Sequence, residues 1–239
     1  MTKLSQHDLW RLSLPALPLA FVALPLYVMW PHYFASRFGV SLGWVGAMLL
    51  VARLLDALLD PWLGHAADAW FRRGATTLQR RSWLMATVLC LGFWMLFFPH
   101  WLLGTTLHWS SLIAWVMLAL IASYLGYSFL NIALQTWGAR LGGDARMRSQ
   151  IVGWREGFGL AGVMLASLLP GLWGMEALVG AFGLLLALSM GAWWHAPHPA
   201  QTHVETNTPP LSGWQSLRRP TARGLDRMLV TDGRSTRKE

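Results

Sequence analysis

Three ionisable residues, Arg53, Asp56 and Asp60, lie inside an otherwise apolar stretch, RLLDALLDP at 53–61. A charge at membrane depth costs roughly 2.5–3.5 kcal/mol on insertion scales, so such residues usually mark the path of an ion or a substrate. Their i, i+3, i+7 spacing places all three within about 60° of arc on one helix face. Two neighbouring carboxylates repel unless a cation, a proton or an arginine compensates them. We therefore predict that Asp56 and Asp60 bind a coupling cation, Na⁺ or H⁺, and that Arg53 balances the pair when the cation is absent.

Two other interpretations of this stripe stay open. The arginine and the aspartates can form a structural clamp that only holds helices together. Alternatively, Asp60 lies near the cytoplasmic interface rather than at membrane depth, because Pro61 follows it and Asp68 is close in sequence.

A second polar stripe is predicted on the helix expected at about 110–136, where polar side chains recur every three or four residues. Its members are Tyr124, Tyr127, Ser128, Asn131 and Gln135. The stripe is interpreted either as part of a solute pathway or as interhelical hydrogen bonding that serves packing alone. Arg155 and Glu156 begin the next apolar segment and belong either to the pathway or to the interface.

The elements that must position these residues are membrane-spanning helices. The chain has 239 residues, of which 54% are hydrophobic and only 13% are charged, and its mean hydropathy is +0.39. This composition predicts an all-α integral membrane protein. The net charge of +8 comes from basic residues between the apolar runs, a pattern typical of membrane topology rather than of nucleic-acid binding. The lone Cys90 cannot form an internal disulfide, and the absence of GxSxG or HExxH motifs and of a metal-ligand cluster predicts neither an enzyme nor a cofactor.

Six apolar runs approach or exceed the roughly 20 residues that a membrane-spanning helix needs. They lie at about 12–36, 41–64, 82–103, 110–136, 150–173 and 175–195, so residues 1–195 are expected to form one six-helix bundle. Residues 196–239 are rich in Pro, Thr and Arg, and we expect them to form a cytoplasmic, largely disordered tail.

Basic residues mark every second connection between these runs. They are Lys3 and Arg11 before the first run, Arg72, Arg73, Arg80 and Arg81 between the second and third, Arg140, Arg146 and Arg148 between the fourth and fifth, and several in the tail. The positive-inside rule therefore predicts a multi-pass protein of the inner membrane with both termini in the cytoplasm.

The segment SLGWVGAMLLVARLLDALLDPWLGHAAD, followed by RRSW, resembles the second helix and the 2–3 loop of the glycoside–pentoside–hexuronide:cation symporters, the melibiose permease-like branch of the major facilitator superfamily. The residues that carry the resemblance are Arg53, Asp56, Asp60, Pro61, Gly64, Asp68, Arg80, Arg81 and Trp83. Within them, Gly64, Asp68 and the arginines 72, 73, 80 and 81 resemble the superfamily's cytoplasmic 2–3 loop motif. The resemblance implies one half of a major facilitator bundle.

The resemblance also implies roles for single residues. Asp56 and Asp60 match the family's cation-binding aspartates, and Ser128 stands where the family has a hydroxyl ligand. Asn131 replaces a sugar-binding aspartate of sugar-transporting members, and the corresponding position on the first helix holds Leu19 or Ala20. Arg155 or Glu156 falls near a family arginine beside the substrate. The implied activity is symport of an organic solute, such as a sugar, with the cation half of the site better kept than the sugar half.

Transporters of this superfamily bind substrate between two six-helix halves. The chain contains one such half, so we expect a truncated product, or a half that pairs with itself or with a separately encoded C-terminal half. The alternative is a half-size structural or assembly membrane protein, in which the stripe of Arg53, Asp56 and Asp60 only holds helices together.

Overall fold

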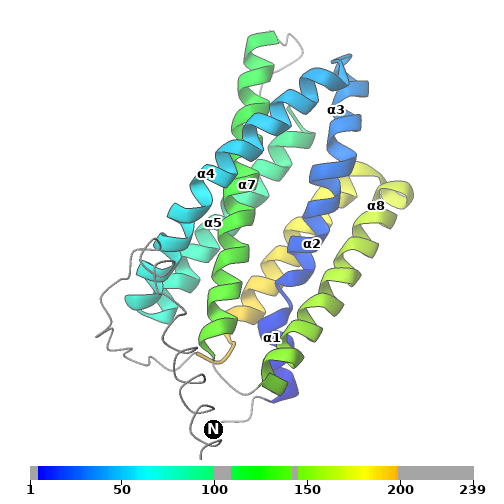
Figure 1. Cartoon of the computed structure of the whole chain (residues 1–239). Helices are drawn as coiled ribbons and strands as arrows, with labels where there is room; N and C mark the ends of the chain where they lie inside the picture. The colour runs from blue at the N-terminus through cyan, green and yellow to red at the C-terminus, as the bar shows by residue number, and fades with distance from the viewer. Residues whose placement is uncertain (1–4, 100–108, 142–144, 199–239) are drawn as a thin grey trace, which may run out of the picture. The chain divides into compact units, whose positions relative to one another are not determined.

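The computed structural model describes residues 5–99, 109–141 and 145–198, and the expected tail from 199 onward, like the end of the third expected span, lies outside these residues. The described elements are α1 (Gln6–Ser13), α2 (Ala16–Leu24), the π-helical η1 (Pro25–Met29), α3 (Trp30–Phe38), α4 (Leu42–Arg72), α5 (Ala75–Phe97), α7 (Trp109–Arg140) and α8 (Ala145–Trp194). All of these elements are helical, and Figure 1 shows them side by side along one bundle. The predicted all-α class is confirmed.

Four described segments are long and apolar enough to cross a membrane: Gln6–Phe38, Leu42–Arg72, Trp109–Arg140 and Ala145–Trp194. The count differs from the six spans expected for two reasons. Helix α5 carries Arg80 and Arg81 in its first half, which lowers its hydropathy. Helix α8 is counted once although its backbone leaves the helical conformation at Gly174, where φ is 80° and ψ is −179°. Figure 1 shows the chain reversing direction within α8.

The first span is irregular because prolines interrupt its hydrogen-bond ladder. Pro25 and Pro31 lack an N–H, so neither can donate to the carbonyl four residues earlier. Between them the helix widens into η1, which closes with a bond from the Trp30 N–H to the Pro25 carbonyl. Single π turns of this kind are frequent at functional sites.

Small residues let the helices approach closely. A Cβ on Gly126 of α7 would lie 2.7 Å from the Cβ of Leu89 on α5, and a Cβ on Gly162 of α8 would overlap the Leu17 carbonyl of α2. Contacts this tight fix the relative height of the paired helices, because only glycine leaves room for the facing backbone.

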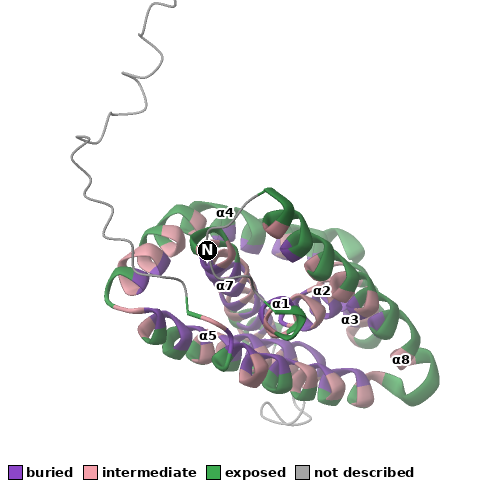
Figure 2. Ribbon diagram, turned by 90° about the horizontal axis from the view of Figure 1, so that it is seen from below, coloured by how far each residue is buried: buried purple, intermediate pink, exposed green. Residues whose placement is uncertain are grey.

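An aromatic cluster joins α2, α5 and α8 in the bundle interior. The ring of Phe182 lies 6.2 Å from that of Phe21 and 4.9 Å from that of Phe93, and all three side chains are fully buried. In Figure 2 the buried residues line the inward faces of the helices and the exposed ones lie on the rim.

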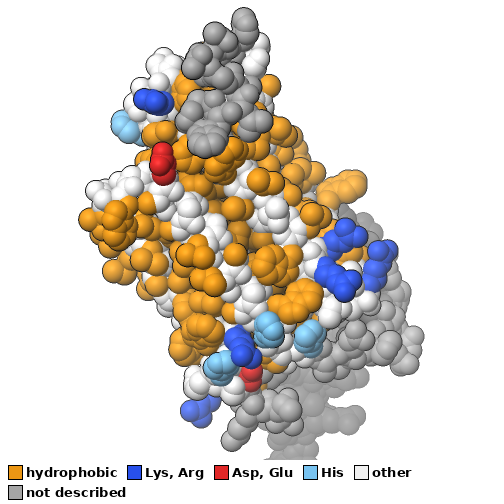
Figure 3. Space-filling view, turned by 180° about the vertical axis from the view of Figure 1, so that it is seen from behind, with side chains coloured by type: hydrophobic (Ala, Val, Ile, Leu, Met, Phe, Trp, Pro, Cys, Tyr) orange, Lys and Arg blue, Asp and Glu red, His pale blue; other side chains and the backbone are white. Residues whose placement is uncertain are grey.

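The outer surface is strongly apolar. Leu58 and Trp62 on α4 are 70% and 76% exposed, and Leu160 and Trp173 on α8 are 68% and 70% exposed. Figure 3 shows hydrophobic side chains over most of one face, with Lys and Arg gathered toward its edges. Such a surface is suited to lipid rather than to water, as expected for a membrane protein.

Candidate functional site

Asp56 is the centre of the candidate site and is only 4% exposed. Its Oδ1 accepts a hydrogen bond of 2.8 Å from the Ser128 hydroxyl, and its Oδ2 accepts one of 3.3 Å from Arg53 Nη1. The pair of residues 56 and 128 joins α4 to α7 across 72 residues of sequence. The two polar stripes expected on separate helices therefore meet at one carboxylate.

Arg53 lies between the carboxylate and two tyrosines. Its Nη1 donates a 2.8 Å hydrogen bond to the Tyr27 hydroxyl, and its guanidinium carbon lies 5.1 Å from the Tyr27 ring centre and 5.7 Å from that of Tyr124. The two rings are stacked with their centres 5.7 Å apart. The two distances from the guanidinium to the rings fall within the range of cation–π attraction, so the two tyrosines hold the Arg53 guanidinium in place.

Asp60 lies one turn beyond Asp56 on α4 and is half-buried. Its Oδ1 is fully buried and has no hydrogen-bond partner among the described residues. A buried, unpartnered carboxylate oxygen carries a desolvation cost that a bound cation or proton would relieve. Asp56, Asp60 and Ser128 together offer oxygen ligands, which hard cations prefer. The described residues contain no cluster of three or more His, Cys, Asp or Glu side chains for a metal ion.

The remaining members of the α7 stripe lie further along the same helix. Tyr127 and Asn131 are half-buried and Gln135 is exposed. Gln135 Nε2 lies 3.4 Å from Asn131 Oδ1, so these two amides interact mainly with each other. They extend the polar stripe from Ser128 toward the C-terminal end of α7.

Arg155 and Glu156 lie in the first half of α8, where Arg155 is half-buried and Glu156 is exposed. Among the described residues, the ion pairs are Arg53 with Asp56 and Arg140 with Asp68, so neither Arg155 nor Glu156 joins the pair around Asp56.

The residues of the predicted 2–3 loop motif are mostly helical. Gly64, Asp68 and Arg72 lie on α4, and Arg80 and Arg81 lie on α5, which leaves Arg73 and Gly74 as the turn. Asp68 Oδ1 accepts a 2.9 Å bond from Arg140 Nη2 of α7, and the Arg81 guanidinium lies 5.3 Å from the Trp70 ring. At this end of the bundle, an ion pair therefore links α4 with α7, and a cation–π contact links α4 with α5.

Two residues of these networks were not predicted as site residues. Tyr27 is brought to Arg53 by the π turn, and the only available signal was a tyrosine between two prolines in an apolar run. Arg140 was used only as a topology marker, although it is the partner of Asp68.

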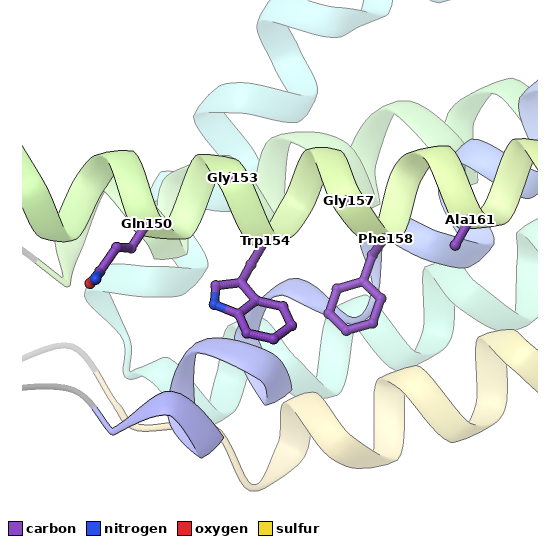
Figure 4. Close-up of a pocket in the computed structure, with 6 residues that line it drawn as sticks. All are labelled: Gln150, Gly153, Trp154, Gly157, Phe158 and Ala161. Atoms are coloured by element: carbon purple, nitrogen blue, oxygen red, sulfur yellow. The ribbon is translucent and has the colours of Figure 1, made fainter.

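Two surface hollows on the described part of the chain lie away from Arg53, Asp56 and Asp60. One, of about 570 Å³, is lined by Gln150, Gly153, Trp154, Gly157, Phe158 and Ala161 of α8. Figure 4 shows its side chains projecting from one side of α8, and Trp10 of α1 meets Phe158 edge-on at 6.4 Å. The other, of about 690 Å³, lies between α5 and α8 beside Cys90 and Glu176. Neither includes Asp56 or Asp60.

A helical membrane bundle with a buried carboxylate, here Asp56 bonded across two helices by Ser128, is typical of membrane transporters. A family model described as "MFS/sugar transport protein" matches residues 12–193, and the chain belongs to this family. The resemblance carried by the α4 motif is thereby confirmed.

A curated relative is the inner membrane symporter YicJ of Escherichia coli strain K12, which is 29% identical over 147 residues. The match covers 60% of this chain and 30% of the relative, so the chain spans less than two thirds of the relative's length. No solved structure matches the chain.

Proposed function

We propose that the chain forms part of a cation-coupled secondary transporter, which moves a small organic solute such as a sugar together with H⁺ or Na⁺ across the inner membrane. The family match and the name of the symporter relative support transport. The observation that carries the proposal is the buried Asp56, bonded to Ser128, with the unpartnered Oδ1 of Asp60 one turn away.

In this proposal Asp56, Asp60 and Ser128 supply the oxygen ligands of the coupling cation. The cation, or a proton on one carboxylate, compensates the second negative charge, which Arg53 alone does not. Because two carboxylates face one arginine, the site without a cation carries a net negative charge inside an apolar bundle. That imbalance favours cation uptake before the bundle changes conformation.

The solute would bind next to this site, along the polar stripe of α7. Tyr127, Asn131 and Gln135 supply hydroxyl and amide groups suited to a neutral polar solute, and the aromatic rings supply a stacking surface. Arg155 and Glu156 are proposed to complete the pathway from α8.

The transport cycle needs a second set of helices, because the substrate site of such transporters lies between two halves. We propose that a second six-helix half, either a C-terminal half or a second copy of the chain, supplies these helices. The ion pair of Asp68 with Arg140 would keep the cytoplasmic end closed in one state of the cycle.

The test is the response of the purified full-length chain to cations. We expect Na⁺, exchanged for choline at constant ionic strength, or protons in a pH series without Na⁺, to raise the thermal unfolding temperature of the wild type. Asp56→Asn and Asp60→Asn should abolish this rise, because each removes one charged ligand. Glu176→Gln, which neutralises an exposed acid on α8, is the matched control and should respond like the wild type. A wild type that responds to neither ion would contradict the proposal.

A purely structural role for the stripe is the second candidate, and the bonds of Asp56 to both Arg53 and Ser128 favour it. Under that role, Asp56→Asn lowers the unfolding temperature in every buffer, and cations do not stabilise the native chain.

A further inference from the structure

The π-helical turn η1 places one side chain, Tyr27, against the charged residues of α4. Tyr27 is the third residue of this turn, and a regular α-helix over Pro25–Met29 would rotate the residues that follow by about 100° for one residue of shift. The adjacent Val28 is 66% exposed, which shows that the inward position belongs to Tyr27 alone within this pair.

The Tyr27 hydroxyl and Asp56 both accept a hydrogen bond from the same nitrogen of Arg53. Nη1 lies 2.8 Å from the tyrosine oxygen and 3.3 Å from Asp56 Oδ2, so the shorter bond is to the tyrosine. Cation–π contacts with the Tyr27 and Tyr124 rings, at 5.1 Å and 5.7 Å, pull the guanidinium in the same direction.

Asp60 Oδ1 has no hydrogen-bond partner among the described residues, although an arginine is seven residues away on the same face. This oxygen is buried, and Arg53 forms no ion pair with Asp60 among the described residues. The Arg53 side chain is 55% exposed, so packing alone does not keep it in place.

We propose that Tyr27 is a positioning residue that keeps the Arg53 guanidinium, already paired with Asp56, from reaching Asp60 and thereby keeps the site open for the coupling cation. Without its hydroxyl, Arg53 would settle between Asp56 and Asp60, bond to both carboxylates and compete with the cation. The inference rests on the proposed function, because it assigns to Tyr27 a control over the affinity of that same site.

The experiment measures the midpoint of cation-induced thermal stabilisation in the purified full-length chain, with Na⁺ in place of choline and, separately, with protons. Tyr27→Phe keeps the ring and removes only the hydroxyl. We expect the cation concentration that gives half of the stabilisation to rise about tenfold, which is the effect of losing one hydrogen bond to a charged group. Tyr33→Phe, on the next turns of the same span and in ring contact with Phe97, is the matched control and should leave the midpoint unchanged.

A double-mutant cycle tests whether Tyr27 acts through Arg53. Arg53→Gln removes the competitor, so adding Tyr27→Phe to it should change the midpoint no further. An unchanged or tighter midpoint in Tyr27→Phe, or an equal loss in both backgrounds, overturns the inference while the proposed cation site stands. A wild type that responds to neither Na⁺ nor protons overturns both. If Tyr27→Phe lowers the unfolding temperature equally at all cation concentrations, the hydroxyl is structural and the inference is wrong.

Discussion

Ser128 and Asp56 show what a single hydroxyl contributes inside the bundle. The Ser128 hydroxyl donates to a carboxylate on another helix, whereas Ser123, five residues earlier on α7, donates to the Ala119 carbonyl of its own helix. Both side chains are buried, so the two serines differ mainly in what they bond.

This difference gives a prediction at the residue scale. Ser128→Ala leaves Asp56 Oδ1 buried without its donor, and we expect a loss of about 1–3 kcal/mol in unfolding free energy together with a weaker cation midpoint. Ser123→Ala removes only a bond within α7 and should leave the cation midpoint unchanged. Chemical unfolding of both variants, with and without Na⁺, measures the two quantities. Equal cation midpoints in the two variants would contradict a role for Ser128 as a ligand.

Part of the site could be predicted from residue spacing. Arg53 and Asp56 are three residues apart on one helix, so their ion pair follows from helical geometry. The bond from Ser128 to Asp56 depends on how α4 and α7 are aligned. The spacing of residues within either helix gives no information on that alignment. Tyr27 required knowledge of the π turn, since a regular α-helix gives a different register after Pro25.

At the scale of helices, the glycines of α8 differ sharply in their surroundings. Gly162 faces the backbone of α2 at Leu17, whereas Gly157 has nothing within 4 Å of an added Cβ. The two positions lie in the same helix and allow a matched comparison.

We predict that Gly162→Ala separates α8 from α2 and costs about 1–3 kcal/mol, the usual cost of overpacking. Gly157→Ala meets open space and should be neutral or stabilising by up to about 1 kcal/mol, because alanine favours the helix. Thermal unfolding in the same detergent compares them. A Gly162→Ala chain as stable as Gly157→Ala would show that α2 and α8 are not packed as described.

The helices themselves were largely predictable because hydropathy marks apolar segments directly. The runs at 41–64 and 110–136 correspond to parts of α4 and α7, which continue further to Arg72 and Arg140. Hydropathy carries no information on hydrogen bonding. It therefore predicted neither the π turn of the first span nor the continuation of α4 beyond its apolar part.

At the scale of the whole molecule, the placement of basic residues predicts the orientation of the bundle. The connection before α5 contains Arg72 and Arg73, whereas the end of α3 contains only Arg37. The positive-inside rule therefore predicts that the α4–α5 turn lies in the cytoplasm and the α3–α4 turn on the opposite side.

Cysteine labelling in intact cells tests this orientation. In a Cys90→Ser background, which removes the only cysteine, we expect a membrane-impermeant maleimide to label Ser36→Cys but not Thr76→Cys, two exposed positions at opposite ends. Both should be labelled after the membrane is made permeable, which controls for reactivity. Labelling of Thr76→Cys alone in intact cells would reverse the predicted topology.

The reversal at Gly174 has a consequence for how the chain enters the bilayer. Between residues 157 and 194 the only charged side chain is Glu176, and a single residue with φ 80° turns the chain back without a polar loop. The two arms of α8 can therefore leave the translocon together as a preformed hairpin, since only one carboxylate has to be carried across the hydrocarbon. The position of Gly174 therefore sets where this hairpin turns.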